Sequence, residues 1–294
     1  MRNTDYLSLS KRLCDAVKKA LVMDIRQYGL RGLRSDDIAD TKATHTVDRI
    51  AYRALLPLLE EVPAKVHMEG FNFPERQHPE FTIFIDPVDG SANWDRGIGD
   101  PCFCLAITEK EGNLLFRDLS FAYVEGLRSG DRYYTAGNRS YFHHALTDRD
   151  TPLKTSTIGN MREAMAYIKP GYSGAGPLLN RFLPHFYKVR DIRAIDNSGM
   201  EICELARGAT DILIEARELS DFYNLLALPI LYNAGGIART LNGPDLSDTI
   251  IVPEAQYDYI ATANKSLMSE VMELYDHFAR KGEHELGNGR FFLK

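Results

Sequence analysis

IFIDPVDGSANW, residues 83–94, is the stretch of this sequence that decides the fold. It continues an apolar run that begins at Phe81, and such a run is typical of a strand buried on both faces. Pro87 lacks a backbone donor, and Gly90 permits a conformation that other residues avoid. We therefore expect the strand to stop before the first aspartate and a stiff turn to follow over residues 86–91.

Two carboxylates, Asp86 and Asp89, then lie three positions apart at the carboxyl end of a buried strand. Buried carboxylates repel each other unless cations compensate them, and hard oxygen ligands of this kind suit Mg²⁺, Mn²⁺ or Ca²⁺. A helix after Gly90, with Ser91 as its N-cap, would point free N–H groups at the ions and offer a place for a phosphate. The bare pentapeptide DPVDG is more often only a good turn.

The whole stretch is more specific than a turn, because it joins a buried strand, two acids, a glycine and a hydroxyl in one order. It resembles the D-P-[IVL]-D-G-[ST]-x-N-[FW] signature of the inositol monophosphatase family, Mg²⁺-dependent and lithium-sensitive phosphatases of sugars and nucleotides. Every signature position is filled, from Asp86 to Trp94. The resemblance implies an α+β fold, the layered α-β-α-β-α sandwich of the sugar phosphatases.

Two acids outside the signature are further candidates. A helix is predicted from about Thr44 or Thr46 to Glu61, and Asp48 lies in its first turn, where a negative charge favours the helix dipole. Glu69 ends a short predicted strand, and an isolated acid there is most often a solvated loop residue. The resemblance implies a functional role for both Asp48 and Glu69. Relatives carry T-x-x-D on this helix, and they carry an acid pair where this chain has only Glu69.

A later segment resembles the family with departures. Residues 196–213, DNSGMEICELARGATDIL, match a second family motif, but Asp196 stands where many relatives have arginine. Asp221 corresponds to the acid of the family's W-D-x-A-A-G, although the tryptophan and the A-A-G are absent. Alone, Asp221 would be a helix cap or a first-turn acid. The glycine pair at residues 235–236, at the family's usual distance, favours a metal ligand instead.

The resemblance implies two or three Mg²⁺ ions, with Mn²⁺ also possible, and an attacking water oriented by side chains. The implied metal ligands are Glu69, Asp86, Val88 (through its carbonyl), Asp89 and Asp221. The implied catalytic residues are Asp48, Glu69 and Ser91. The implied phosphate-binding residues are Asp89, Gly90 and Ser91.

The sequence therefore predicts a Mg²⁺-dependent phosphomonoesterase acting on a small phosphorylated polyol or sugar, with inositol monophosphate as the leading substrate. Fructose-1,6-bisphosphatase and 3′-phosphoadenosine 5′-phosphate phosphatase of the same family are the alternatives. The missing second acid beside Glu69 and the altered segment at Asp221 favour another class, a catalytically weak sensor or scaffold that binds metal or phosphate. The resemblance also implies a homodimer.

The composition is ordinary for a globular enzyme, with 294 residues, 44% hydrophobic, 26% charged and a net charge of −6. This charge gives no basic field for nucleic acid, and no apolar run reaches membrane-spanning length. We predict one catalytic domain over residues 1–284, with halves of about 1–160 and 161–284, and a tail over 285–294. The amino-terminal segment lacks the apolar core of a signal peptide, so a cytoplasmic location is expected.

The four cysteines show neither C-x-x-C spacing nor a nearby histidine ladder, which argues against a zinc site. Cys102 and Cys104 lie two positions apart, so on a strand they would share one face. We expect them to serve as small core residues in a reducing compartment.

Overall fold

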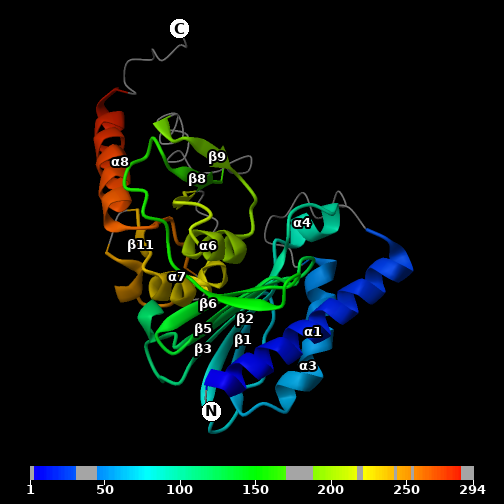
Figure 1. The fold of residues 1–294 in the computed structure, drawn as a ribbon. Coiled ribbons are helices and arrows are strands. Elements are labelled where there is room, and N and C mark those ends of the chain that lie inside the picture. The colour runs from blue at the N-terminus through cyan, green and yellow to red at the C-terminus, as the bar shows by residue number, and fades with distance from the viewer. Residues whose placement is uncertain are drawn as a thin grey trace.

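The computed structural model describes residues 3–30, 45–169, 188–216, 221–241, 244–252 and 255–285. Two β-sheets lie face to face, with helices between them and on the outer face of each (Figure 1). This arrangement is the predicted five-layered α-β-α-β-α sandwich. The predicted tail falls almost wholly on residues 286–294, which lie outside the described residues.

The first sheet has seven strands that follow one another in chain order. They are β1 (Ala64–Met68), β2 (Phe81–Asp89), β3 (Cys102–Thr108), β4 (Phe121–Gly126), β5 (Arg132–Ala136), β6 (Arg139–His144) and β7 (Arg149–Pro152). Only β1 and β2 are parallel, and each later pair is antiparallel. The parallel pair places the carboxyl ends of β1 and β2 side by side at one edge of the sheet.

Strand β2 is buried on both faces, as its apolar run predicts. Ile83 and Ile85 face one core cluster, whereas Phe84 faces the other. The expected stop before Asp86 was wrong, because β2 continues to Asp89. Strand β2 continues past Pro87 because its pairing with β3 shifts in register at this point.

This register shift decides where the signature acids point. Asp86 pairs with Cys104 and Asp89 pairs with Cys102. Between these two pairs β2 therefore contains one residue more than β3, which is a β-bulge. In a regular strand, residues three apart point to opposite faces. The two cysteines are two apart and share a face, so the bulge turns both carboxylates to that same face.

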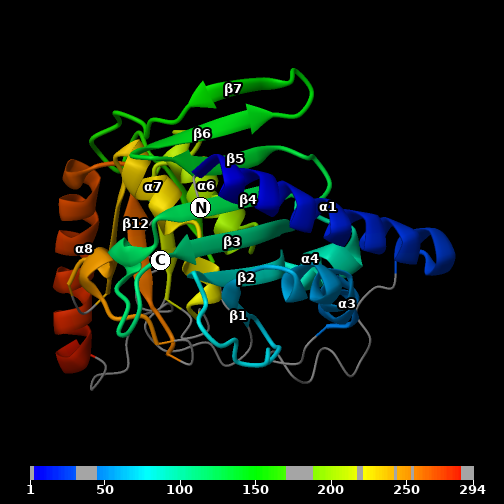
Figure 2. The same cartoon turned by 90° about the horizontal axis from the view of Figure 1, so that it is seen from below.

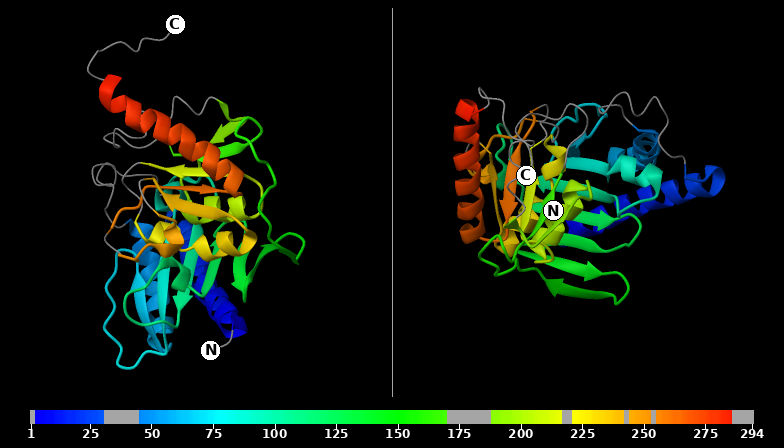
Figure 3. Two further views of the ribbon diagram at one scale, coloured as in Figure 1. Left: turned by 90° about the vertical axis from the view of Figure 1, so that its left-hand side faces the viewer. Right: turned by 90° about the horizontal axis from the view of Figure 1, so that it is seen from above.

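The second sheet has five strands in the order β11 (Ile237–Thr240), β12 (Tyr259–Thr262), β10 (Ile212–Glu215), β8 (Met165–Ile168) and β9 (Asp191–Arg193). Strand β12 is antiparallel to both of its neighbours, whereas β8 is parallel to both of its own. Helix α8 (Lys265–Glu285) packs against β12 and forms an outer layer (Figure 3).

Helices α1 (Asn3–Tyr28) and α3 (Thr46–Glu60) cover the outer face of the first sheet (Figure 2). Their buried positions recur at helical spacing, for example Leu13, Val17 and Leu21. Among the described residues, no helix is long and apolar enough to cross a membrane.

Helices α6 (Ser198–Ala206) and α7 (Leu228–Ala234) form the layer between the sheets. The short helix α4 (Ser91–Arg96) follows β2, and single 3₁₀ turns lie at η1 (Phe116–Asp118), η3 (Tyr223–Leu225) and η4 (Leu246–Asp248). The amino end of α6 therefore faces the same side of the first sheet as the signature acids.

Candidate metal centre

Five of the predicted site residues come together at the carboxyl edge of β1 and β2. Glu69 follows β1 directly, and its backbone N–H donates to the carbonyl of Ile85 at 3.0 Å, which sets it beside Asp86. The carboxyl group of Glu69 also forms a hydrogen bond with the carboxyl group of Asp86, and the charges of three more acids act on Glu69. These acids are Asp48 from α3, Asp89 from β2 and Asp221 from the segment before η3.

The charges of this acid cluster are poorly compensated. Burial, followed by the charge of Asp221, raises the pKa of Glu69 to about 8. Burial, followed by Glu69 and Asp89, raises the pKa of Asp86 well above its ordinary range. No basic side chain is among the groups that act most strongly on Glu69 and Asp86. Such a cluster is costly to keep ionised unless cations enter it.

Asp89 differs from the other acids because protein groups partly offset its burial. Burial raises its pKa, whereas the buried ammonium of Lys169 and a backbone donor lower it. That donor is the N–H of Gly199 near the amino end of α6, 2.6 Å from Oδ2. Asp89 therefore has one oxygen fixed by the second half of the chain.

The hydroxyl of Ser91 links Asp48 to the signature turn. Its Oγ lies 2.6 Å from Oδ1 of Asp48 and 2.8 Å from the carbonyl oxygen of Val88. Asp48 also accepts from the backbone N–H of His45 at 3.0 Å. Burial raises the pKa of Asp48 to about 6, and the bond from Ser91 opposes that shift. A carboxylate and a hydroxyl are thus held together at the rim of the acid cluster.

The N-cap of α4 is Gly90, not Ser91 as predicted. Gly90 has a φ of 85°, a left-handed conformation that side chains with a Cβ resist. A Cβ at this position would also lie 2.0 Å from Oδ1 of Asn197. Asn93 of the signature donates to that same oxygen at 2.8 Å. These contacts hold the signature turn against Asn197, the residue before α6.

Sequence reasoning missed a buried ionic group behind Asp89. Lys169 is 1% exposed, and its ammonium lies 3.2 Å from Glu201, 3.3 Å from Glu215 and 3.8 Å from Asp196. It also donates to the hydroxyl of Ser198 at 2.5 Å. A lysine that follows an apolar strand normally marks a solvated strand end, so the pattern carried no signal of this group.

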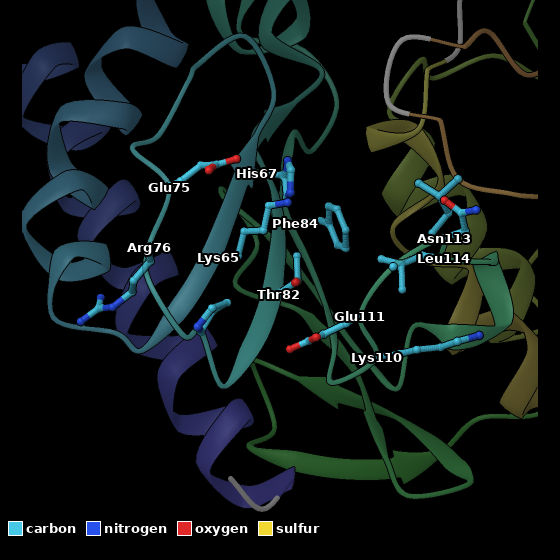
Figure 4. A pocket seen from close by; sticks show the side chains of 13 residues that line it. Lys65, His67, Glu75, Arg76, Thr82, Phe84, Lys110, Glu111, Asn113 and Leu114 are labelled. Carbon is cyan, nitrogen blue, oxygen red and sulfur yellow. The ribbon is translucent and has the colours of Figure 1, made fainter.

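A cavity of about 490 Å³ lies along the inner face of β1 and β2, between the pair His67 and Phe84 and the turn at residues 110–114 (Figure 4). His67 and Phe84 stack there with ring centroids 5.1 Å apart, each two residues before an acid of the cluster. Two of its three basic side chains already have partners. Arg76 donates to backbone carbonyls, and Lys110 bonds Asp118 at 2.8 Å. The cavity is therefore a poor phosphate site.

The metal-free protein is expected to be more stable at about pH 6 than at about pH 8. Because the pKa of Glu69 is raised to about 8, the folded state binds more protons than the unfolded state below that pH. This stability is lost as pH rises through the folded pKa, at about 1.4 kcal/mol per pH unit for each such proton. Thermal unfolding in a chelator measures it. A midpoint that rises with pH would contradict the expectation, and excess Mg²⁺ should flatten the dependence.

The chain is similar to curated archaeal proteins at low identity. It is 24% identical over 281 residues to the fructose-1,6-bisphosphatase/inositol-1-monophosphatase of Archaeoglobus fulgidus, covering 93% of this chain and 99% of that protein. It is 25% identical over 225 residues to the bifunctional NADP phosphatase/NAD kinase of Methanococcus maripaludis. That match covers 71% of this chain and 39% of the length of that relative. No protein-family model matches the chain.

Solved structures share the fold over nearly the whole chain. The IMPase of Thermotoga maritima has a TM-score of 0.71 at 16% identity and covers 94% of this chain and 99% of its own. Inositol monophosphatase II of Staphylococcus aureus has a TM-score of 0.70 at 17% identity and covers 98% of this chain and 100% of its own. At these identities the likeness is one of fold, and it agrees with the five layers described above.

Proposed function

The chain belongs to the inositol monophosphatase family, and we propose that it is a Mg²⁺-dependent phosphomonoesterase of small phosphorylated polyols or sugars. The observation that carries the proposal is the acid cluster. The carboxyl groups of Glu69 and Asp86 are buried and hydrogen-bonded to each other. No basic side chain is among the groups that act most strongly on their pKa values. Such a cluster is unfavourable as a purely structural feature and favourable as a cation site.

The donor set fits hard divalent cations. It consists of carboxylate oxygens with one carbonyl and one hydroxyl, the ligands that Mg²⁺ prefers. In the proposal, the metal ligands are Glu69, Asp86, Asp89, Asp221 and the carbonyl of Val88. Bound Mg²⁺ supplies an acidified water and a counter-charge for the departing oxygen.

The protein's own contribution is positioning and proton handling. The Ser91 hydroxyl and the Asp48 carboxylate, 2.6 Å apart, orient the attacking water, and the carboxylate accepts its proton. The backbone N–H groups of Gly90 and Ser91, at the start of α4, bind the phosphate oxygens. Burial of Asp86, which is 1% exposed, keeps bulk water out of the cluster and strengthens these interactions.

For the substrate, we propose a hydroxyl-rich monophosphate, with inositol monophosphate leading. Near Asp89, Lys169 is the basic side chain that acts most strongly, and it is already paired with Glu201 and Glu215. Asp196 adds another negative charge to this group. These charges disfavour a second phosphate on the leaving group, and hence fructose 1,6-bisphosphate and 3′-phosphoadenosine 5′-phosphate.

A second candidate is the 2′-phosphate of a nucleotide. The relative from Methanococcus maripaludis is named an NADP phosphatase, and one Staphylococcus structure of the same fold has 2′-AMP bound. A 2′-phosphoribose is also a monophosphate flanked by a hydroxyl. The inositol and 2′-nucleotide candidates therefore share one chemistry at the reacting centre. By the same charge argument, NADP, whose leaving group carries a diphosphate, ranks below 2′-AMP within this second candidate.

The test is phosphate release from a panel of esters with and without Mg²⁺. The panel is inositol 1-phosphate, 2′-AMP, NADP, fructose 1,6-bisphosphate and 3′-phosphoadenosine 5′-phosphate. Full activity in chelator would reject the metal-dependent scheme. Binding of Mg²⁺ in calorimetry without turnover of any ester would favour the sensor or scaffold reading instead. Lys65→Ala, at an exposed position lining the neighbouring cavity, is the control.

The Ser91→Ala variant is expected to fold normally and lose turnover by about a hundredfold, because it removes one partner of the water-orienting pair. Its Mg²⁺ affinity should fall less, since the carboxylate ligands remain. Steady-state kinetics with a metal titration separates the two effects. An unchanged kcat would remove Ser91 from the proposed mechanism.

We further propose a cytoplasmic homodimer. The location is supported by the four cysteines, all of them free and buried. The dimer is supported by the family resemblance. Light scattering of the purified full chain tests the oligomeric state, and a monomer would contradict the dimer.

A further inference from the structure

Two thiols that the proposed phosphatase chemistry does not use lie directly behind Asp89. Cys102 and Cys104 share the inner face of β3, and both are buried. Their Sγ atoms are 3.6 Å apart, and Sγ of Cys102 is 3.5 Å from Oδ2 of Asp89. Among the described residues, these three side chains form a group whose potential ligand atoms all lie within 4.8 Å of one another.

The separations match the edges of a coordination tetrahedron. Zinc binds thiolate sulfur at about 2.3 Å and carboxylate oxygen at about 2.0 Å. Tetrahedral angles then place two sulfurs about 3.8 Å apart and a sulfur and an oxygen about 3.5 Å apart. The observed 3.6 Å and 3.5 Å are two of these edges to within a few tenths of an ångström. The third edge, between Sγ of Cys104 and the carboxylate of Asp89, is within 4.8 Å, and this pair has to approach to the tetrahedral separation to hold one ion.

Gly199 lets the backbone of α6 approach all three ligand atoms closely. A Cβ at Gly199 would lie 2.3 Å from Sγ of Cys104, 3.2 Å from Oδ2 of Asp89 and 3.3 Å from Sγ of Cys102. The first distance is too short for a carbon atom, so any other residue here would displace the thiol of Cys104. The three ligand atoms therefore converge on the amino end of α6, where the N–H of Gly199 also donates to Oδ2 of Asp89 at 2.6 Å.

We propose that Cys102, Cys104 and Asp89 form a second metal site, selective for Zn²⁺ over Mg²⁺, whose occupation inhibits the enzyme. Thiolates are soft ligands that Zn²⁺ accepts and Mg²⁺ does not. On binding, each thiol loses its proton to solvent, and water completes the fourth position. The sequence spacing argued against zinc because the third ligand comes from a different strand and is visible only in the fold.

Inhibition follows from the shared carboxylate and rests on the proposed function. Asp89 is 5% exposed and belongs to the acid cluster, so a cation that enters the cluster reaches it before the thiols. Zn²⁺ held by the thiols takes Asp89 away from Mg²⁺. Mg²⁺ in excess is expected to relieve the inhibition, because the two metals compete for one carboxylate.

Cobalt is the direct probe, because Co²⁺ in a thiolate site shows a sulfur-to-metal charge-transfer band in the near ultraviolet and intense visible bands. Co²⁺ in an all-oxygen octahedral site shows neither. The full-length wild type, freed of metal and titrated with Co²⁺, is expected to show both features, and Zn²⁺ should abolish them. A wild-type spectrum without the charge-transfer band overturns the proposal, whatever the phosphatase activity is.

Matched cysteine variants assign the ligands. Cys104→Ser should weaken the charge-transfer band, because one of the two thiolates is gone, and should bind Zn²⁺ more than about tenfold more weakly in calorimetry. Cys14→Ser is the control, because Cys14 is buried in the other core cluster. Its spectrum and Zn²⁺ affinity should match the wild type. A band of undiminished intensity in Cys104→Ser, or a weakened band in Cys14→Ser, contradicts the assignment.

Activity assays then test the consequence separately. Zn²⁺ should inhibit Mg²⁺-supported phosphate release by the wild type and Cys14→Ser, and should inhibit Cys104→Ser at least about tenfold less strongly. Equal inhibition of all three would refute the coupling through Asp89. If no ester is turned over, the proposed function fails while the cobalt spectra still decide the metal site.

Discussion

The Asp86→Asn variant is expected to lose phosphate release by at least about a thousandfold while the metal-free protein becomes more stable. Asp86 interacts strongly with the rest of the cluster, because the charges of Glu69, Asp89 and Asp48 all raise its pKa. Replacing it by the neutral amide removes one of the proposed metal ligands. It also removes one of the buried charges that repel one another, so the apo protein should gain about 1–2 kcal/mol.

Phosphate release and thermal unfolding with and without Mg²⁺ are the two measurements. The wild type should be strongly stabilised by Mg²⁺, since a ligand that binds only the folded state raises the midpoint. Asp86→Asn should begin from a higher midpoint and gain little from Mg²⁺. Asp248→Asn is the matched control, because Asp248 forms an exposed ion pair with Arg117 far from the cluster. It should behave as the wild type in both measurements.

A stability gain with loss of activity is the diagnostic combination. A variant that loses both activity and metal-free stability would mean that Asp86 is a structural acid satisfied by the protein. Its hydrogen bond from the backbone N–H of Val88, at 3.0 Å, is the contact that such a role would use. A variant that retains activity would reject the metal-ligand role proposed for Asp86.

The signature predicted the buried strand and the glycine turn after it because this information is local. The buried run from Phe81 to Ile85 and the glycine at position 90 constrain only their neighbours, and the fold bears both out. The continuation of β2 through Pro87 could not be read from the sequence. It depends on the partner strand, where Cys102 and Cys104 set the register that absorbs the extra residue.

The predictions of Glu69 and Asp221 as site residues depended on the family resemblance. Local sequence patterns alone would not have identified them. Glu69 lacks the second acid of its relatives, and Asp221 lacks the family's flanking residues. The fold nevertheless brings Glu69 to Asp86 through the parallel β1–β2 pair, and it brings Asp221, from the segment before η3, close enough to Glu69 to raise its pKa. Parallel pairing brings together strand ends that lie far apart in the chain, which no window of sequence reveals. Their roles as metal ligands remain a prediction.

Lys169 was missed for a different physical reason. A lysine is almost never fully buried unless it is paired, and its partners Glu201 and Glu215 come from α6 and β10. None of the three is close to the others in sequence, and each alone predicts a solvated charge. The group becomes visible only when the second sheet and α6 are packed together.

The Lys169→Met variant is therefore expected to lose about 3–5 kcal/mol of unfolding free energy. Methionine fills much of the volume of the lysine stem, so the packing loss is small. The loss comes from Glu201 and Glu215, both 0% exposed, which would be left without their cation. Denaturant unfolding in the presence of Mg²⁺ measures the change. A loss below about 1 kcal/mol would show that the ion group contributes little, as exposed pairs do.

A compensating variant separates the charge effect from the packing effect. Lys169→Met/Glu201→Gln removes one of the two stranded carboxylates, so it should recover part of the lost stability. Lowering the pH should also help Lys169→Met more than the wild type, because the pKa of Glu201 is already raised by burial and rises further without the ammonium. A glutamate with a raised pKa in the folded state destabilises more as pH increases, and protonation removes that cost. If the double variant is no more stable than Lys169→Met and neither responds to pH, the contribution of Lys169 lies in its packing, not in its charge.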